Sequence, residues 1–148
     1  MKVSTRVEYG VLALADIAIY GGAGISVTAL EISGRQGISK KYLEQILPLL
    51  RQAGLIRALK GQRGGYLLAR SPQQILMSDV LNALDPSVLE PMEIPGGDSP
   101  RDLRLAVVDC LWRPLNALLS DFAAGKTLAS FLIECQALMP DGSDMYVI

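Results

Sequence analysis

The sequence predicts a mostly α-helical fold with one small β-hairpin, followed by a long C-terminal helix. Three observations lead to this expectation. Helix-capping residues followed by apolar residues at helical spacing recur through residues 1–54. Two short apolar segments then flank a glycine-rich turn within residues 55–69. An apolar stripe at helical spacing returns over residues 101–124.

Composition is typical of a globular chain. Half of the 148 residues are hydrophobic and a fifth are charged. No apolar run approaches the ~18 residues of a membrane span, and residues 1–6 lack a signal-peptide pattern. Two well-separated cysteines, Cys110 and Cys135, indicate a reducing compartment and no disulfide framework. We expect a cytoplasmic protein without a membrane partner.

The net charge of −1 hides a strong asymmetry between the two halves of the chain. Residues 1–71 carry ten Lys or Arg against four Asp or Glu, whereas residues 72–148 carry four against eleven. A basic half joined to an acidic half makes the first half a candidate for binding a polyanion.

The first two helices have recognisable starts. Thr5 and Glu8 are three residues apart, as are Thr28 and Glu31, and both pairs fit a capping box. The first helix should end at Gly21, where the apolar periodicity stops.

A third helix follows the second after a very short turn. The second helix should end near Gly37, and Ser39 can cap the third. Two helices joined by a short turn containing glycine form the outline of a helix-turn-helix. Pro48 predicts a kink or break, with residues 39–47 as the reading head and 48–53 as a short continuation.

The third helix has a polar face near its N-terminal end, made of Lys40, Lys41, Glu44 and Gln45. In a helix-turn-helix this part of the second helix enters the major groove. Lysine contacts phosphate or guanine, glutamine suits adenine, and glutamate accepts from cytosine. The alternative is an ordinary solvated helix face.

The glycine-rich stretch that follows could cradle a phosphate or turn a hairpin. Neither the Walker pattern nor the dinucleotide fingerprint is present. Apolar segments 55–59 and 66–69 instead flank the turn, as in a hairpin with a loop longer than two residues. A hairpin directly after a recognition helix is a wing, and Lys60 and Arg63 would give its tip positive charge.

The segments "MKVSTRVEYGVLALADIA" and "YLEQILPLLRQAGLIRALKGQRGGYLLA" resemble the Rrf2 family of bacterial transcriptional regulators. The resemblance covers residues 1–85 and continues more weakly through "LWRPLNALLSDF" and "KTLASFL". It implies a winged helix-turn-helix at 1–85, a loop at 86–100 and a dimerisation segment at 101–148. Such proteins are homodimers that bind palindromic operators in double-stranded DNA.

Carried over residue by residue, the resemblance implies a set of DNA contacts in the recognition helix and the wing. Lys2 and Thr5, at the N-terminal end, match positions near the backbone phosphates. With neighbours in the helix and the wing, the candidate DNA-binding residues are Lys2, Thr5, Ser39, Lys40, Lys41, Tyr42, Glu44, Gln45, Lys60, Gln62, Arg63 and Gly64.

Many members of this family bind an iron–sulfur cluster through three cysteines in the loop that precedes the dimerisation helix, often with a histidine. The loop 86–100 has no cysteine, and the chain has no histidine. We therefore expect no metal site and no cofactor, and interpret Cys110 and Cys135 as buried structural thiols. A cluster bridged between subunits and a thiol-based redox sensor stay open as alternatives.

The acidic half supports a dimer. The stripe at 101–124 is long enough for an inter-subunit helix pair, although Pro114 should bend or divide it. The alternative is that the stripe packs on its own winged domain. Thr127 can cap a last helix that ends near Leu138, before Pro140.

The chain ends on three apolar residues, Tyr146, Val147 and Ile148. They could dock on the dimer core. The chain also resembles the clusterless cysteine-metabolism repressors of the family, which pair with O-acetylserine sulfhydrylase (cysteine synthase). The resemblance therefore implies that these three residues could bind that enzyme through the terminal carboxylate.

The sequence thus predicts a sequence-specific DNA-binding regulator, acting as a homodimeric repressor, with control of cysteine or sulfur metabolism through a protein partner as a hypothesis. The alternative is a redox or iron–sulfur-responsive regulator of the same family. A winged helix that binds only protein is a further alternative. An enzyme is not expected, because the chain lacks histidine and any recognisable nucleophile set or phosphate loop.

Overall fold

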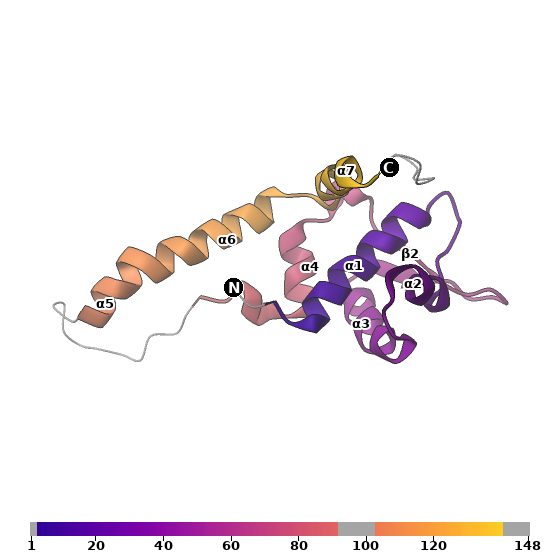
Figure 1. Ribbon diagram of the computed structural model, residues 1–148, viewed down its shortest axis with the longest axis horizontal. Helices are drawn as coiled ribbons and strands as arrows, with labels where there is room; N and C mark the ends of the chain where they lie inside the picture. Colours follow the sequence, from indigo (N-terminus) through magenta and orange to yellow (C-terminus); the bar gives the residue numbers. More distant parts are fainter. Residues whose placement is uncertain (1–2, 92–102, 141–148) are drawn as a thin grey trace.

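The computed structural model describes residues 3–91 and 103–140. It is mostly helical with a two-stranded antiparallel sheet, which confirms the expected fold class (Figure 1). The elements, in chain order, are α1 (Thr5–Tyr20), α2 (Ala29–Gln36), α3 (Lys40–Gln52), β1 (Ile56–Ala58), β2 (Tyr66–Leu68), the 3₁₀ turns η1 (Pro72–Gln74) and η2 (Pro86–Val88) on either side of α4 (Met77–Leu84), α5 (Leu103–Val107), the π-helical segment η3 (Val108–Trp112), α6 (Arg113–Gly125) and α7 (Leu128–Leu138).

The helix starts follow the capping residues, with one correction. The backbone N–H of Val7 donates to the Ser4 hydroxyl, so Ser4 caps α1 and the predicted cap at Thr5 is wrong by one residue. Ser4 has an extended backbone, whereas Thr5 is already helical. The capping box of α2 is confirmed, because the N–H groups of Glu31 and Thr28 each donate to the other side chain, at 3.2 and 2.8 Å.

The turn between α2 and α3 also follows the prediction. Gly37 ends α2 with φ of 68°, in the left-handed region that favours glycine. Ser39 caps α3 by accepting the N–H of Tyr42 at 3.1 Å. The helix-turn-helix is therefore present.

The break expected at Pro48 does not occur. Helix α3 runs continuously from Lys40 to Gln52 with Pro48 inside it. The side chains of Leu47 and Leu50 on either side are buried in the core. Their burial offsets the hydrogen bond that the proline removes.

The predicted hairpin is confirmed. Strands β1 and β2 pair antiparallel with Arg57 opposite Leu67. Val27 adds a further bridge to Tyr66, with N···O distances of 3.0 and 2.7 Å between the two backbones. The segment before α2 is thereby attached to the hairpin.

An ion pair between the buried Asp16 and the partly exposed Arg35 joins α1 to α2. Asp16 is 1% exposed, and its carboxylate accepts two hydrogen bonds from the Arg35 guanidinium at 2.8 and 2.9 Å and one from Gln36 at 2.8 Å. The hydrogen bond from Arg35 to Asp16 raises the pKa of Arg35. Helix α2 itself buries only Ile32, so these polar contacts supply much of its attachment to α1.

The helical segment after residue 102 projects from the winged domain as an arm, formed by α5, η3 and α6 (Figure 1). Pro114 neither bends it sharply nor divides it, since helical structure runs from Leu103 to Gly125. The N–H of Arg113 donates to the carbonyl of Val108, five residues earlier. This wider turn lies directly before the proline and absorbs the irregularity.

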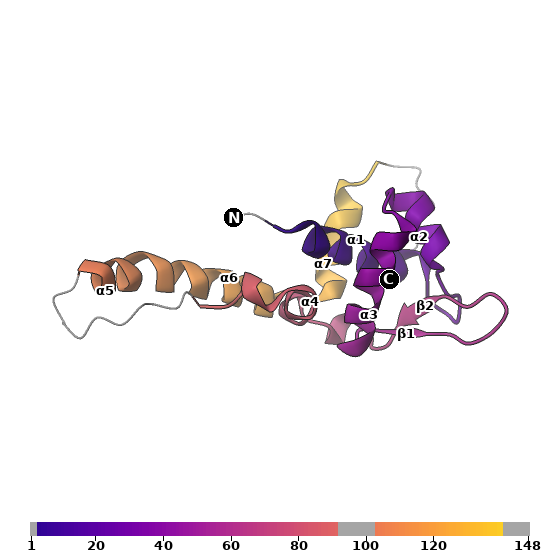
Figure 2. The same ribbon diagram turned by 90° about the horizontal axis from the view of Figure 1, so that it is seen from below.

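The last helix returns to the winged domain, which the sequence analysis did not anticipate. Thr127 caps α7 as predicted, and the helix ends at Leu138. Leu128 and Leu132 are buried in the same core as residues of α1 and α3. Figure 2 shows α7 lying against the winged domain and not along the arm. The N–H of Leu128 donates to the carbonyl of Ile75 at 2.7 Å, so α7 completes the core of the domain.

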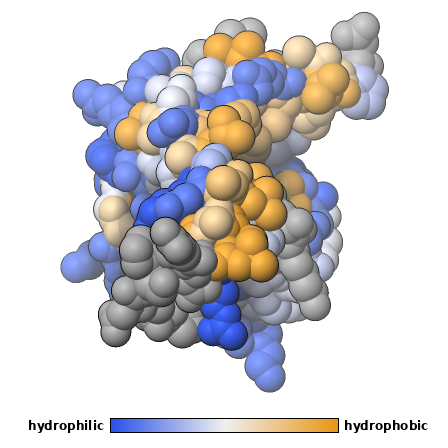
Figure 3. Space-filling model, turned by 90° about the vertical axis from the view of Figure 1, so that its left-hand side faces the viewer, coloured by the Kyte–Doolittle hydropathy of each residue, from blue (hydrophilic) through white to orange (hydrophobic). Residues whose placement is uncertain are grey.

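The apolar stripe of the arm is exposed in the single chain. It consists of Leu103, Val107, Leu111, Leu115, Leu118 and Phe122, which are 41–77% exposed. The alternative that it packs on its own domain is therefore wrong. Figure 3 looks onto the end of the molecule from which the arm projects and shows apolar residues gathered in a band beside hydrophilic surface.

The two cysteines are less enclosed than expected. Cys110, on η3, is exposed, and Cys135, on α7, is half-buried. The interpretation of Cys110 as a buried thiol is thus wrong for the single chain. Cys110 lies on the arm, which projects from the winged domain and leaves this residue exposed. Within residues 3–91 and 103–140, no helix combines the length and apolarity needed to cross a bilayer.

The first testable prediction concerns the ion pair between α1 and α2. We expect Asp16→Asn to lower the free energy of unfolding by about 2–3 kcal/mol, because it leaves Arg35 without its buried carboxylate. Urea unfolding followed by circular dichroism measures the change. The control is Asp109→Asn, which removes an exposed ion pair with Arg113 and should change stability by less than about 0.5 kcal/mol. Equal effects of the two substitutions would contradict the assignment.

Candidate nucleic-acid interface

The polar face of α3 is exposed as the sequence predicted. Lys40, Lys41, Glu44 and Gln45 are all exposed in the first turns of the helix. The opposite face packs into the core through buried residues, namely Leu43, Ile46, Leu47 and Leu50. The helix is therefore held by one face and presents the other, with charged and amide groups that suit base edges and phosphates.

Two of the candidate residues on α3 already have structural contacts. The Ser39 hydroxyl caps the helix. Tyr42 is half-buried, and its ring meets the ring of Tyr9 edge to face at 5.3 Å between centroids. Tyr42 therefore fixes α3 against α1, a role that sequence reasoning did not assign to it.

The hairpin loop at residues 59–65, which we call the wing tip, carries the second set of candidates. Lys60, Gln62 and Arg63 are exposed there, and Gly64 is half-buried. The N–H of Leu59 donates to the carbonyl of Gly65 at 2.9 Å and closes the loop at its base.

The base of the wing tip is anchored to the segment before α2. The Ser26 hydroxyl, on a residue that is 7% exposed, donates to the Gly64 carbonyl at 2.7 Å. A Cβ on Gly65 would lie 2.9 Å from the Ser26 hydroxyl and 3.0 Å from the Val27 carbonyl oxygen. Gly65 has φ of 102°, so both its backbone conformation and the close approach require glycine. No periodic pattern marks Ser26, and sequence reasoning missed it.

Arg63, the predicted cation of the wing tip, is paired in this structure. Its guanidinium donates to the Glu31 carboxylate at 2.8 Å. The N–H of Thr28 contributes most to lowering the pKa of Glu31, and Arg63 lowers the pKa further. Glu31 therefore stays ionised near neutral pH and links the wing tip to the start of α2.

The remaining candidate residues are either exposed without an ion-pair partner among the described residues or lie outside the described ranges. Thr5 is exposed in the first turn of α1. Lys40, Lys41 and Lys60 form no ion pair with any residue that the structure describes. Lys2, and Tyr146–Ile148, lie outside the described residues.

Comparison with known families gives a match along most of the chain. The model of the Rrf2 family, described as iron-dependent transcriptional regulators, matches residues 3–134. The HTH-type transcriptional regulator IscR of Sodalis glossinidius is 36% identical over 132 residues, which cover 89% of this chain and 79% of the relative. IscR of Aliivibrio salmonicida is 34% identical over 134 residues, with 90% and 79% covered.

Two solved structures share the fold over nearly their whole length. The structure of T. potens IscR aligns with a TM-score of 0.74 and 34% identity, covering 96% of this chain and 94% of that one. CymR, the global cysteine regulator of B. subtilis, aligns with a TM-score of 0.78 and 27% identity, covering 90% and 98%.

The residues present do not fit an iron–sulfur cluster held by one chain. A cluster takes about four protein ligands, mostly thiolates. The chain has two cysteines, on η3 and α7, and no histidine. Within the part of the chain that the structure describes, no three His, Cys, Asp or Glu side chains gather in a group that could hold a metal ion.

The anchoring of the wing tip gives the second testable prediction. Gly61 and Gly65 both have a positive φ, but only a Cβ at Gly65 would meet other atoms within 4 Å. We expect Gly61→Ala to destabilise the protein by about 1 kcal/mol through backbone strain alone. Gly65→Ala should destabilise it by about 2–3 kcal/mol, because the contacts with Ser26 and Val27 add to the strain. Urea unfolding compares them, and equal losses would contradict the anchoring role of Gly65.

Proposed function

Because the chain belongs to the Rrf2 family of DNA-binding transcriptional regulators, we propose that it binds a palindromic operator as a homodimer and represses transcription. In this proposal α3 enters the major groove and the wing tip lies in the adjacent minor groove. The main support for this proposal is that one basic domain with a single packed core presents two groups of exposed polar residues. One group lies on α3 and the other on the wing tip. Operator binding also implies a cytoplasmic location.

The candidate residues divide into two classes of contact. Glu44 and Gln45 are the proposed base readers, because their exposed side chains accept from cytosine and pair with adenine. Lys40, Lys41 and Lys60 are proposed phosphate contacts, since none of them is neutralised by a described residue. Lys2, Thr5, Ser39, Tyr42, Gln62 and Gly64 complete the proposed contact set.

Arg63 needs a change of partner to contact DNA. Its ion pair with Glu31 is largely exposed, with 64% and 35% of the two side chains accessible. Exposed pairs contribute about 0–1 kcal/mol, so a phosphate or a narrow minor groove can replace Glu31 as partner at small cost. Until DNA is bound, the pair holds the wing tip in position.

The arm is the proposed dimer interface. Its stripe is exposed over six apolar residues in the single chain, from Leu103 to Phe122. An apolar face of this extent along one helix is stabilised when a second copy covers it. The two winged domains would then face half-sites about one DNA turn, or a multiple of it, apart.

The nature of the signal separates two candidate functions. The relatives named IscR support a redox or iron–sulfur-responsive regulator more strongly than the likeness to the global cysteine regulator supports control of cysteine metabolism. Since the donor set does not fit a cluster within one chain, thiols are the responsive groups that this chain offers. Burial raises the pKa of the Cys135 thiol, whereas Cys110 is exposed in the single chain and lies on the arm that forms the proposed dimer interface.

An absorbance spectrum of the anaerobically purified protein together with a thiol titration separates these functions, because a bound cluster absorbs visible light and a thiol sensor loses free thiols on oxidation. O-acetylserine sulfhydrylase as a partner of Tyr146, Val147 and Ile148 stays a prediction.

The third testable prediction concerns DNA recognition. Operator sequences would first be selected from random duplexes with the purified protein. We then expect Glu44→Ala to change the preferred base at one position, with discrimination reduced by about 1–3 kcal/mol. Lys60→Ala should weaken binding to all sequences alike and lower the slope of log affinity against log salt by about 1. Fluorescence anisotropy at several salt concentrations measures both effects.

The matched control for DNA recognition is Gln52→Ala, at the exposed last residue of α3, which should preserve both affinity and base preference. An unchanged preference in Glu44→Ala would show that α3 is not the reading helix. Absence of salt-dependent affinity for any duplex would refute DNA binding as a whole.

The fourth testable prediction concerns the arm. Leu118→Glu places a charge in the exposed stripe, so we expect it to convert the dimer to a monomer in sedimentation equilibrium. The control is Ala117→Glu, an exposed neighbour that lies about 100° further round the helix and outside the stripe. If both variants stay dimeric, the interface lies elsewhere.

A further inference from the structure

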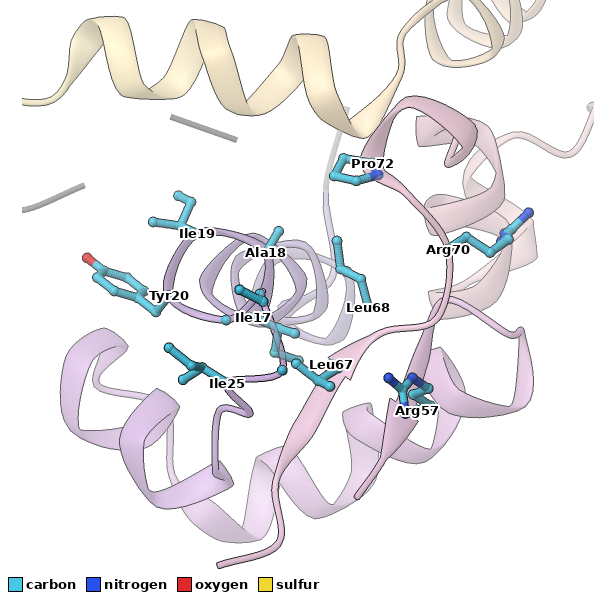
Figure 4. A pocket seen from close by; sticks show the side chains of 14 residues that line it. Ile17, Ala18, Ile19, Tyr20, Ile25, Arg57, Leu67, Leu68, Arg70 and Pro72 are labelled. Atoms are coloured by element: carbon cyan, nitrogen blue, oxygen red, sulfur yellow. The ribbon is translucent and has the colours of Figure 1, made fainter. Parts of the chain in front are cut away.

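A cavity of about 740 Å³ lies at the C-terminal end of α1, and its lining includes no residue of α3 (Figure 4). Its walls come from the end of α1, the loop that follows it, and the hairpin. A volume in the range of roughly 300–1,000 Å³ is typical of small-molecule sites. The lining includes Ile17, Ile19, Ile25, Leu67, Arg57 and Arg70.

The cavity combines an apolar wall with two cations. Ile17, Ile19 and Leu67 are buried beneath it, whereas Ile25 is 57% exposed at its edge. Arg57 and Arg70 lie at the end of the lining away from Tyr20, and the Arg70 side chain points outward, away from the other labelled residues (Figure 4). Neither arginine forms an ion pair with a described residue, and no described lining residue is acidic.

One wall of the cavity is a strained turn connected to the wing. Gly22 and Ile25 exchange two backbone hydrogen bonds, at 2.9 and 3.1 Å, around a two-residue turn. Ala23 in that turn has φ of 50°, a conformation that residues other than glycine seldom adopt. The next residues, Ser26 and Val27, are those that hold the base of the wing tip.

The other end of the cavity connects to α2. Tyr20 is 37% exposed in the lining, and the Arg35 guanidinium lies over its ring at 4.2 Å. Arg35 is also the partner of the buried Asp16. An occupant that contacts Tyr20 and Ile25 would therefore touch the supports of both α2 and the wing.

We propose that this cavity binds a small amphipathic carboxylate and that its occupancy changes the affinity for DNA. The apolar body lies along Ile17, Ile19 and Ile25, and the carboxylate pairs with Arg57, with the exposed Arg70 as a second cation at the same end of the lining. The binding step stands on the cavity alone, whereas its effect on DNA affinity rests on the proposed function. The alternative role for Arg57 and Arg70 is contact with the DNA backbone.

The binding test uses the full chain, without DNA, in isothermal titration calorimetry. The probes are octanoate and phenylpropionate, each compared with the neutral alcohol of the same skeleton. We expect at least one acid to bind about tenfold more tightly than its alcohol, because the carboxylate gains a guanidinium partner that the alcohol does not. The two acids distinguish an aliphatic from an aromatic ligand. Arg57→Gln with Arg70→Gln should abolish the preference for the acid, whereas the control Arg51→Gln, exposed on α3, should keep it.

The second arm measures DNA affinity by fluorescence anisotropy with and without the acid that binds. We expect a change of about fivefold in the unsubstituted protein and none in the double variant. Equal binding of acid and alcohol, or no binding of either acid, overturns the site. Weaker DNA binding by the double variant together with an unchanged acid preference assigns the arginines to DNA instead. Acid binding without any change in DNA affinity overturns only the proposed effect on DNA binding. Loss of DNA binding under all conditions refutes the proposed function but leaves the calorimetric result intact.

Discussion

The contact between the buried Asp16 carboxylate and α2 is the interaction on which the arrangement of the helix-turn-helix depends. Helix α2 is short and buries one side chain, so apolar contacts alone contribute little to its packing on α1. Three hydrogen bonds to a carboxylate from which water is excluded fix both its position and its rotation. Because the turn at Gly37 leads directly into α3, the same contact sets where the exposed face of α3 is presented.

The wing is held by contacts that come from outside the hairpin. Ser26 and Val27 bind its base through side-chain and backbone hydrogen bonds, and Glu31 holds Arg63 at its tip. The inner contacts are buried or part-buried and fix the backbone, whereas the outer ion pair is exposed and readily exchanged. Strong contacts at the base and a weak one at the tip suit the proposed role of the wing, in which the base stays fixed while Arg63 exchanges Glu31 for DNA.

Membership of the family fixes the fold and the DNA-binding role of this chain without fixing its signal. Relatives named IscR and the cysteine regulator CymR share one architecture over most of their length. The signal is a question of local chemistry, and the described residues offer two separate thiols and a cavity with two arginines in its lining.

The sequence by itself determined the local structure: the capping box at Thr28, the cap at Ser39, the turn at Gly37, and the hairpin, all of which depend on residues close together in the chain. Periodicity likewise identified which face of α3 is buried. Only the tertiary structure decided that α3 continues through Pro48, because contacts from distant core residues outweigh a local preference. The return of α7 onto the core and the anchoring of the wing by Ser26 were equally invisible in sequence. Both join segments tens of residues apart, and no periodic pattern records which distant groups a folded chain brings within hydrogen-bonding distance.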